Sequence, residues 1–396
     1  MRKRVDIERL EDKILAPYAM HSKDSGGRTY KESSHDVRTC YQRDRDRIVH
    51  SEAFRKLEYK TQVFIIFEGD YYRTRLTHTI EVAQIARTIG RNLRLNEDLI
   101  EAIALAHDLG HPPFGHAGET ALNEIMKKVG KKFNHNIRSF DIVTKLEKRY
   151  PDFDGLNLSR EVLIGILKHQ TDFDEAAFLK KYPEGPTLEA KVVDMADSLA
   201  YLNHDVDDGL KSGCITEVDL KESELWQKAL SSIPRYELYS REMKRYQIVK
   251  QLIDMQIKDL LNATDEGLTR LKFPSSREVK KHMAGKKHES PINFSPTMKK
   301  QRAFLQKLLL DKLYHHYRVV RMTSKAKRII NDLFEVYCQA PEQLPYVIFP
   351  RGKDFKKVRS FPKEKKFEII CNYIASMTDR AAIEEHKKLF DAYTKV

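Results

Sequence analysis

Residues 78–113 read HTIEVAQIARTIGRNLRLNEDLIEAIALAHDLGHPP, and the spacing of their apolar side chains predicts two antiparallel helices. The apolar positions recur every three or four residues: Val82, Ile85, Ala86, Ile89 and Leu93 within 79–95, then Ile100, Ile103 and Ala104 within 97–109. Gly110 stands where a glycine commonly follows a helix end, and two prolines prevent continuation. We therefore expect a helical hairpin that turns near Asn96.

The rest of the chain is also mainly helical in pattern. Further helices are predicted at 118–129, 137–148, 160–169, 187–208, 221–231, 241–262, 297–337, 363–376 and 379–393. The β-rich stretch 61–67 and a short one at 345–349 allow minor β-hairpin elements, whereas 271–297 is polar and proline-containing and is expected to be a loop or linker. The fold class is therefore all-α, with an additional helical C-terminal region.

Charge is distributed unevenly along the 396 residues, whose formal net charge is +13. Residues 1–269 contain 42 basic and 45 acidic side chains, whereas residues 270–396 contain 29 and 13. A near-neutral body followed by a basic region suggests that the latter faces polyanions, such as phosphates, nucleic acid or another subunit.

Composition excludes several classes of protein. With 41% hydrophobic and 33% charged residues, the chain can bury a core and is neither fibrous nor mainly disordered. It has no apolar run of membrane-spanning length and no apolar leader after the first residues. Its four cysteines are widely spaced, which fits a reducing compartment and argues against a cysteine zinc site. We expect a soluble, cytoplasmic protein with no membrane partner.

Five histidines fall within 58 residues, together with two acidic side chains. The cluster comprises His78, His107, His111, His116 and His135, with Asp108 and Glu119. His78 and His107 both lie on the apolar faces of the predicted helices, so their imidazoles should point into the seam between them. A buried carboxylate next to two histidines is typical of a site for a divalent metal.

A fourth, carboxylate ligand is expected from the helix at 187–208, because a hydrolytic metal site combines few protein ligands with open positions. Asp197, Tyr201 and Asp205 recur every four residues and form one polar line along that helix. Periodicity alone does not single out Asp197, because the same helix offers the rivals Asp194, Asp207 and Asp208.

These elements resemble the HD-domain metal-dependent phosphohydrolases, and within them the deoxynucleoside triphosphate (dNTP) triphosphohydrolases, often called dGTPase-like proteins. The similarity is carried by long blocks in a fixed order: RTCYQRDRDRIVHSEAFRKLEYKTQVF (38–64), RTRLTHTIEVAQIARTIGR (73–91), HDLGHPPFGHAGE (107–119), FNHNIRSF (133–140), VVDMADSLAYLNHDVDD (192–208) and ASMTDRAAIEEHKKLF (375–390).

The resemblance implies hydrolysis of a dNTP to deoxynucleoside and inorganic triphosphate, by attack of water at the α-phosphorus. It assigns the four metal ligands to His78, His107, Asp108 and Asp197. The metal would be Mn²⁺ or Mg²⁺, with Fe, Ni, Co and Zn as alternatives. The resemblance further matches four residues to phosphate contact and proton transfer: His111, His116, Glu119 and His135. In this interpretation Glu119 orients His116.

Substrate contacts are also implied by the resemblance. Arg75 matches a phosphate-binding arginine, and Gln62, Tyr201 and Asp205 match residues that surround the deoxyribose. A tyrosine packed under the sugar would exclude a 2′-hydroxyl. Arginines in the segment RDRDR, residues 43–47, form a self-compensating surface by default, and the family uses such arginines near subunit contacts and regulatory nucleotides.

The expected organisation is an N-terminal helical and oligomer-contact segment (1–60), an HD phosphohydrolase core (61–215) and a basic helical region packed on it (216–396). The expected assembly is a homo-oligomer, a tetramer or a hexamer, with a second dNTP as an allosteric effector. Two other functions stay open. One is a different HD-type activity, as a nucleotidase or a cyclic or alarmone nucleotide hydrolase; the other is nucleic-acid binding through the basic region, as an accessory or main role.

Overall fold

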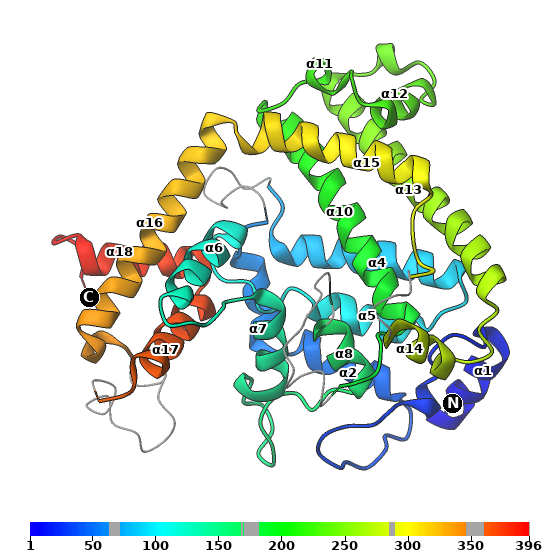
Figure 1. Ribbon diagram of the computed structural model, residues 1–396, viewed down its shortest axis with the longest axis horizontal. Helices are drawn as coiled ribbons and strands as arrows, with labels where there is room; N and C mark the ends of the chain where they lie inside the picture. Colours follow the sequence, from blue (N-terminus) through cyan, green and yellow to red (C-terminus); the bar gives the residue numbers. More distant parts are fainter. Residues whose placement is uncertain (63–71, 168, 170–181, 285–289, 346–359, 396) are drawn as a thin grey trace.

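The computed structural model describes residues 1–62, 72–167, 169, 182–284, 290–345 and 360–395. These residues form an all-α fold (Figure 1), as predicted from the sequence. They contain no strand, only three isolated β-bridges: Arg28 with Ser159, Thr61 with Thr74, and Lys148 with Gly155. Positions 63–67 and 346–349 of the expected extended stretches lie outside the described residues. No described helix is long and apolar enough to cross a bilayer.

Helices α4 (Arg75–Asn92) and α5 (Glu97–Ala106) form the predicted antiparallel hairpin at the centre of the molecule. Each begins with a side chain that caps its first turn: Thr74 accepts from the N–H of Thr77, and Asn96 from that of Leu99. The two helices approach closely at Gly90, where a β-carbon would lie 2.1 Å from the δ-carbon of Ile100.

Helix α5 ends earlier than expected. The prediction ran to residue 109, but the last helical residue is Ala106, so His107 and Asp108 lie in the turn that follows. Gly110 does not adopt the left-handed conformation of a helix cap. Its α-carbon instead packs closely against the backbone of another segment, because a β-carbon there would lie 2.3 Å from the backbone nitrogen of Ser139. This close approach brings the turn against α7 (His135–Asp141).

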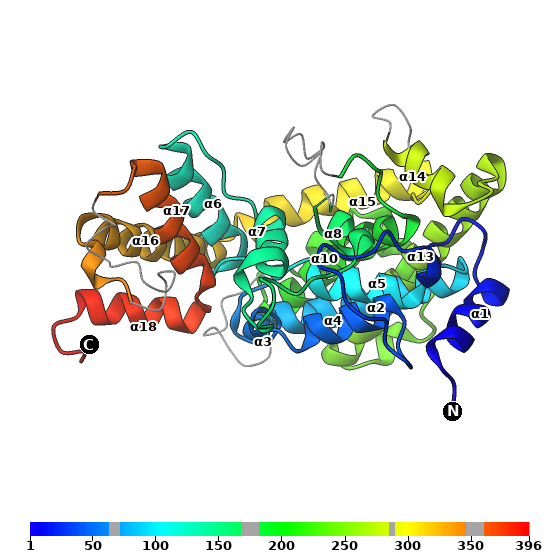
Figure 2. The ribbon, with the colours of Figure 1, turned by 90° about the horizontal axis from the view of Figure 1, so that it is seen from below.

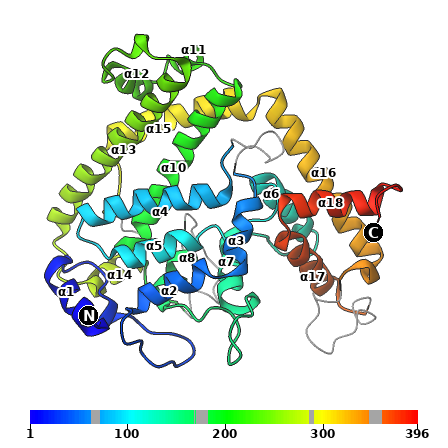
Figure 3. The same ribbon diagram turned by 180° about the vertical axis from the view of Figure 1, so that it is seen from behind.

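Helix α10 (Leu188–Ser212) crosses α4 and also contacts α5, as the view from behind shows (Figure 3). Their apolar faces belong to the larger hydrophobic cluster, to which Tyr41, Ile48 and Leu57 of the N-terminal segment also contribute. The other helices around this cluster are α1 (Arg4–Ile14), α2 (Cys40–Val49), α3 (Glu52–Lys56), α8 (Arg160–Leu167), α11 (Glu217–Leu220), α12 (Glu224–Ser231), α13 (Arg241–Leu271), α14 (Ser276–Ala284) and α15 (Pro296–Leu309).

A second hydrophobic cluster joins α6 (Gly115–Lys127) to the C-terminal helices α16 (Tyr317–Gln339), α17 (Lys363–Ser376) and α18 (Asp379–Phe390). These four helices lie together on one side of the molecule (Figure 2). Thus α6, which carries part of the histidine-rich block, packs on helices that begin 190 or more residues after its last residue, Lys127.

Two predictions for the C-terminal third are wrong in detail. The segment 271–297 contains helix α14, which buries Val279, although positions 285–289 lie outside the described residues. The predicted helix 297–337 is interrupted. After α15 a π-helical turn covers Leu310–Tyr314, and α16 begins after His316, whose side chain caps its first turn. The break turns Tyr314 toward α10. The domain boundaries expected at 60 and 215 stay predictions.

Candidate active site

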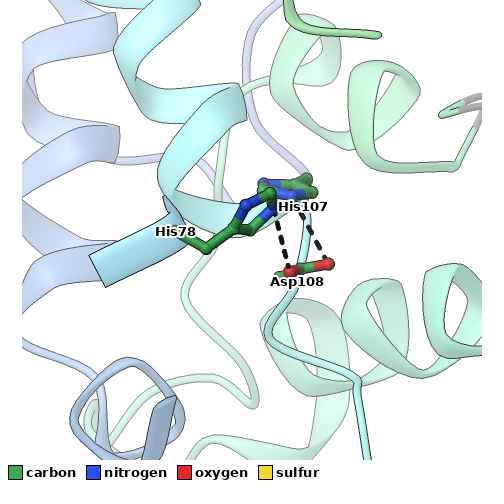
Figure 4. Close-up of side chains that lie close together, drawn as sticks. All are labelled: His78, His107 and Asp108. Atoms are coloured by element: carbon green, nitrogen blue, oxygen red, sulfur yellow. Dashed lines mark ion pairs between the residues drawn. The ribbon is translucent and has the colours of Figure 1, made fainter. Parts of the chain in front are cut away.

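Two elements bring three metal-ligand candidates together. His78 lies on the first turns of α4, whereas His107 and Asp108 follow α5 directly. One ligand atom of each lies within 4.8 Å of the others, all three side chains are buried, and they point toward one another (Figure 4). The helical hairpin therefore creates the cluster, since each ligand sits where one helix faces the other.

Helix α10 supplies the fourth candidate. Asp197 Oδ1 lies 2.9 Å from His78 Nε2 and 3.7 Å from His107 Nε2. The rivals are engaged elsewhere: Asp207 and Asp208 form ion pairs with Arg73, at 2.7 and 3.0 Å, and Asp194 accepts from Lys191 at 2.7 Å. The structure thus brings Asp197, and not its neighbours, to the two histidines.

The donor set fits a divalent metal. The Nδ1 of His107 lies 2.6 Å from the carbonyl oxygen of Ala104, and because a carbonyl can only accept, Nδ1 carries the proton and Nε2 presents a lone pair. That Nε2 is buried and has no hydrogen-bond partner among the described residues. Two imidazoles and two carboxylates suit Mn, Fe, Co, Ni or Zn, and carboxylates also suit Mg.

Charge around Asp108 is compensated by two cationic or polar groups. Arg75 Nη1 lies 2.6 Å from Asp108 Oδ2, and His111 Nδ1 lies 3.0 Å from Oδ1. Burial alone would raise the pKa of Asp108, but Arg75, His107 and His111 outweigh it and hold that pKa well below its usual value. Arg75, predicted to contact phosphate, is therefore buried beside a ligand, with Nη2 as its one group lacking a partner among the described residues.

The proposed proton-transfer group assembles beside this cluster. The rings of His111 and His135 stack with centroids 3.9 Å apart, and Glu119 lies 2.8 Å from His135 Nδ1. Burial opposes ionisation of Glu119, but its contacts with His116 and His135 lower its pKa below the usual range.

Glu119 contacts His116 less closely than the sequence interpretation assumed. The distance from His116 Nδ1 to Glu119 Oε2 is 3.6 Å, and the carboxylate also accepts the backbone N–H of His135 at 2.9 Å. His116 is 56% exposed at its side chain, so it faces open space next to the buried cluster.

A pocket of about 200 Å³ adjoins His116. Gln62 and Tyr201, both predicted to contact the sugar, line it together with Tyr314. The buried side-chain oxygen of Gln62, Oε1, has no partner among the described residues. Asp205 does not line the pocket; it lies behind Tyr314, whose hydroxyl donates to Asp205 Oδ2 at 2.8 Å and also contacts the hydroxyl of Tyr201.

A second pocket of about 510 Å³ shares Phe114, Met322 and Ala326 with the first. Basic side chains from α16 and α18 line it: Arg318, Arg321, Lys325 and Lys387. All four belong to the basic C-terminal region that the sequence analysis expected to face polyanions, and the structure brings them beside the site. The C-terminal region therefore forms one wall of the candidate active site.

The sequence interpretation missed two residues of the site. Tyr314 was concealed by a helical pattern that ran on without a visible break. His169 lies against Asp194, at 2.7 Å through Nδ1, and against Asp197 Oδ2, at 3.2 Å through Nε2. Burial alone would lower the pKa of His169, but the two carboxylates raise it to about 10. The only sign of His169 in the sequence was its position two residues after the apolar segment 160–167.

Replacing His169 with alanine is expected to weaken metal binding by roughly 10- to 100-fold, because partners of a ligating carboxylate fix its orientation. Titration of the metal-free protein with Mn²⁺, followed by calorimetry, measures this. The matched control is His386→Ala, since His386 also pairs with a carboxylate, Asp332 at 2.8 Å, but between α18 and α16. Equal affinity in both variants would contradict the role of His169.

Comparisons with known proteins agree with this geometry. Residues 75–202 match the family model of the HD domain, and residues 292–388 match that of the phosphohydrolase-associated domain. The chain is 46% identical over 386 residues to the deoxyguanosinetriphosphate triphosphohydrolase-like protein of Geobacter metallireducens, covering 96% of each chain. Similarly named proteins of Ralstonia pickettii and Thiobacillus denitrificans are 46% and 44% identical, with 95% of this chain and 94% and 97% of theirs covered.

Proposed function

The chain belongs to the HD-domain phosphohydrolases named deoxyguanosinetriphosphate triphosphohydrolase-like, and we propose that it hydrolyses dNTPs to deoxynucleoside and inorganic triphosphate. Members of that family are hydrolases with a site for a divalent metal. The observation that carries the finer proposal is the pocket bearing Gln62 and Tyr201, which opens beside His116 and next to the His–Asp cluster. It gives a nucleoside a place from which its phosphates reach the cluster.

The metal ligands would be His78, His107, Asp108 and Asp197, and we expect Mn²⁺ or Mg²⁺. When bound, the metal lowers the pKa of water and neutralises phosphate oxygens. The chain contributes further positive charge nearby through Arg75, and through the basic side chains of the second pocket. A triphosphate needs such compensation before water can approach its phosphorus atom.

In the proposed reaction, the oxygen of water forms a bond to the α-phosphorus and the bond from that phosphorus to the 5′-oxygen breaks. One proton must leave the attacking water and one must reach the departing 5′-oxygen. Of the four residues matched to phosphate contact and proton transfer, His116 is the one that lines the pocket, so we assign it one of these transfers. Glu119 and the stacked pair of His111 and His135 form the buried hydrogen-bonded support behind it.

Selection of deoxynucleotides would follow from packing against Tyr201. Its hydroxyl is bound to Tyr314, which in turn binds Asp205, so the ring is held in place at the pocket wall. Replacing Tyr201 with alanine is expected to reduce the preference for dGTP over GTP by about tenfold, because the space for a 2′-hydroxyl opens. The ratio of kcat/KM for the two nucleotides measures this. An unchanged ratio would contradict the role of Tyr201.

The proposed function is tested by incubating the purified protein with Mn²⁺ and each of the four dNTPs, singly and in mixtures. Release of intact triphosphate supports it, whereas release of phosphate or pyrophosphate would point to another HD-type activity. The mixtures show whether one dNTP activates the hydrolysis of another. Oligomer size, a dNTP effector and accessory nucleic-acid binding stay predictions.

A further inference from the structure

Asp379 is a buried carboxylate of the C-terminal region that no step above uses. It is the first residue of α18, and its exposed fraction is 0%. Its two oxygens accept hydrogen bonds from two distant segments: Oδ2 from the backbone N–H of Thr61 at 2.9 Å and from the Thr61 hydroxyl, and Oδ1 from the backbone N–H of Phe114 at 2.8 Å. One carboxylate thus joins residues 318 and 265 positions away.

Both segments lead directly into the candidate active site. Thr61 precedes Gln62, and its carbonyl accepts from Arg75 Nε at 3.1 Å, while Arg75 holds Asp108. Phe114 is two residues before His116, and Thr61 and Phe114 line the same pocket as His116. By accepting these hydrogen bonds, Asp379 connects the metal-ligand side of the site to its proton-transfer side.

The backbone at Phe114 needs such support. Its φ of 65° and ψ of 21° place a large aromatic residue in the left-handed region, and Gly115 follows with φ of 55°. An L-residue rarely adopts that region, because its β-carbon crowds the following carbonyl oxygen. It persists where the surroundings fix it. Here they are the hydrogen bond to Asp379 and the packing of the Phe114 ring in the second hydrophobic cluster. The sharp turn starts α6 at Gly115 and directs His116 to the pocket.

We propose that Asp379 is a positioning residue, which holds the Gln62 segment and the His116 turn in register so that substrate and proton-transfer group meet. Helix α18 contributes this carboxylate across the junction between the HD core and the phosphohydrolase-associated region. The geometry gives that region a role in the reaction beyond packing. The kinetic part of this inference rests on the proposed dNTP hydrolysis; the structural part does not.

The substitution Asp379→Asn tests it, because an amide nitrogen of the same size cannot accept a hydrogen bond, so one of the backbone N–H groups loses its acceptor. We expect kcat for triphosphate release to fall about 10- to 100-fold, as for a small misplacement of reacting groups. Bound metal should be unchanged. Amide hydrogen exchange, measured by mass spectrometry, should accelerate in peptides containing Thr61 and Phe114. The variant Thr61→Val, which removes only the hydroxyl contact, should have an intermediate kcat.

The control is Glu189→Ala. Glu189 is also fully buried, and its Oε1 accepts two backbone N–H groups, from Met20 at 2.8 Å and Asn96 at 3.3 Å, but it joins segments away from the pocket. The alanine variant leaves both N–H groups without this acceptor, so it should lose stability and retain kcat. An unchanged kcat in Asp379→Asn, or a loss of kcat in both variants that follows their loss of Tm, would overturn the positioning role. If the wild-type protein releases no triphosphate, the proposed function fails, while unchanged exchange at Thr61 and Phe114 would separately overturn the hydrogen-bonded link.

Discussion

Replacing His107 with alanine is expected to remove the metal and at least about 1000-fold of the hydrolytic rate. The buried Nε2 of His107 has no partner among the described residues and faces Asp108 and Asp197 at 3.4 and 3.7 Å. Without it, two carboxylates remain with too few neutral donors to hold a cation tightly. A metal supplies several kcal/mol of transition-state stabilisation, and each 1.4 kcal/mol corresponds to a factor of ten in rate.

Elemental analysis of the purified His107→Ala protein, together with triphosphate release in excess Mn²⁺, measures both effects. The variant also loses a buried side chain, so its Tm is recorded, and His107→Gln provides a less disruptive second variant. His386→Ala serves again as control, because its imidazole lies outside the cluster. A His107 variant that keeps one metal per chain and full activity would overturn the metal-ligand assignment.

Replacing His116 with alanine is expected to lower kcat by roughly 100- to 10,000-fold, the usual contribution of a positioned acid or base, with no loss of metal. Its side chain is 56% exposed, so the fold should tolerate the change. The two variants therefore separate metal binding from proton transfer: both lose activity, and only the His107 variant loses metal.

The control for His116 lies on the same helix. Glu124 is exposed and pairs only loosely with Lys327, at 3.9 Å, so Glu124→Ala should retain full activity. Full activity of His116→Ala would exclude it as the proton-transfer group. Loss of activity only with single nucleotides, and not in dNTP mixtures, would instead indicate that His116 influences activation by a second nucleotide.

The helical hairpin and the position of its candidate metal ligands could be predicted from the sequence because they depend on local rules. A period of three to four residues fixes which side of a helix is apolar, so His78 and His107 had to face the seam. The position of Asp108 beside these histidines could be predicted because it is the next residue after His107. The basic excess after residue 269 was also visible, and part of it, Arg318, Arg321 and Lys325, lines the pocket next to the site.

The remaining features depended on which distant segments meet. Asp194, Asp197, Asp207 and Asp208 share one helix and one residue type, and only the crossing of α10 over α4 brings Asp197 to the histidines. Glu119 could not be assigned to His135 from spacing, because that contact joins two elements 16 residues apart. The break before α16, which directs Tyr314 to Asp205, contains no proline or glycine from which it could have been predicted.

What the sequence by itself determined is therefore the all-α fold, the two buried histidines of the hairpin that are metal-ligand candidates, and the family to which the chain belongs. Helical periodicity and adjacent residues encode these directly. Periodicity left Asp197 among its rivals, and the family resemblance selected it. Only the tertiary structure decided the inclusion of His169 and Tyr314 and the link from Asp379 to Thr61 and Phe114. Such contacts arise when hydrophobic surfaces pack and leave buried polar groups to find partners across the chain, and no local pattern records which partner is found.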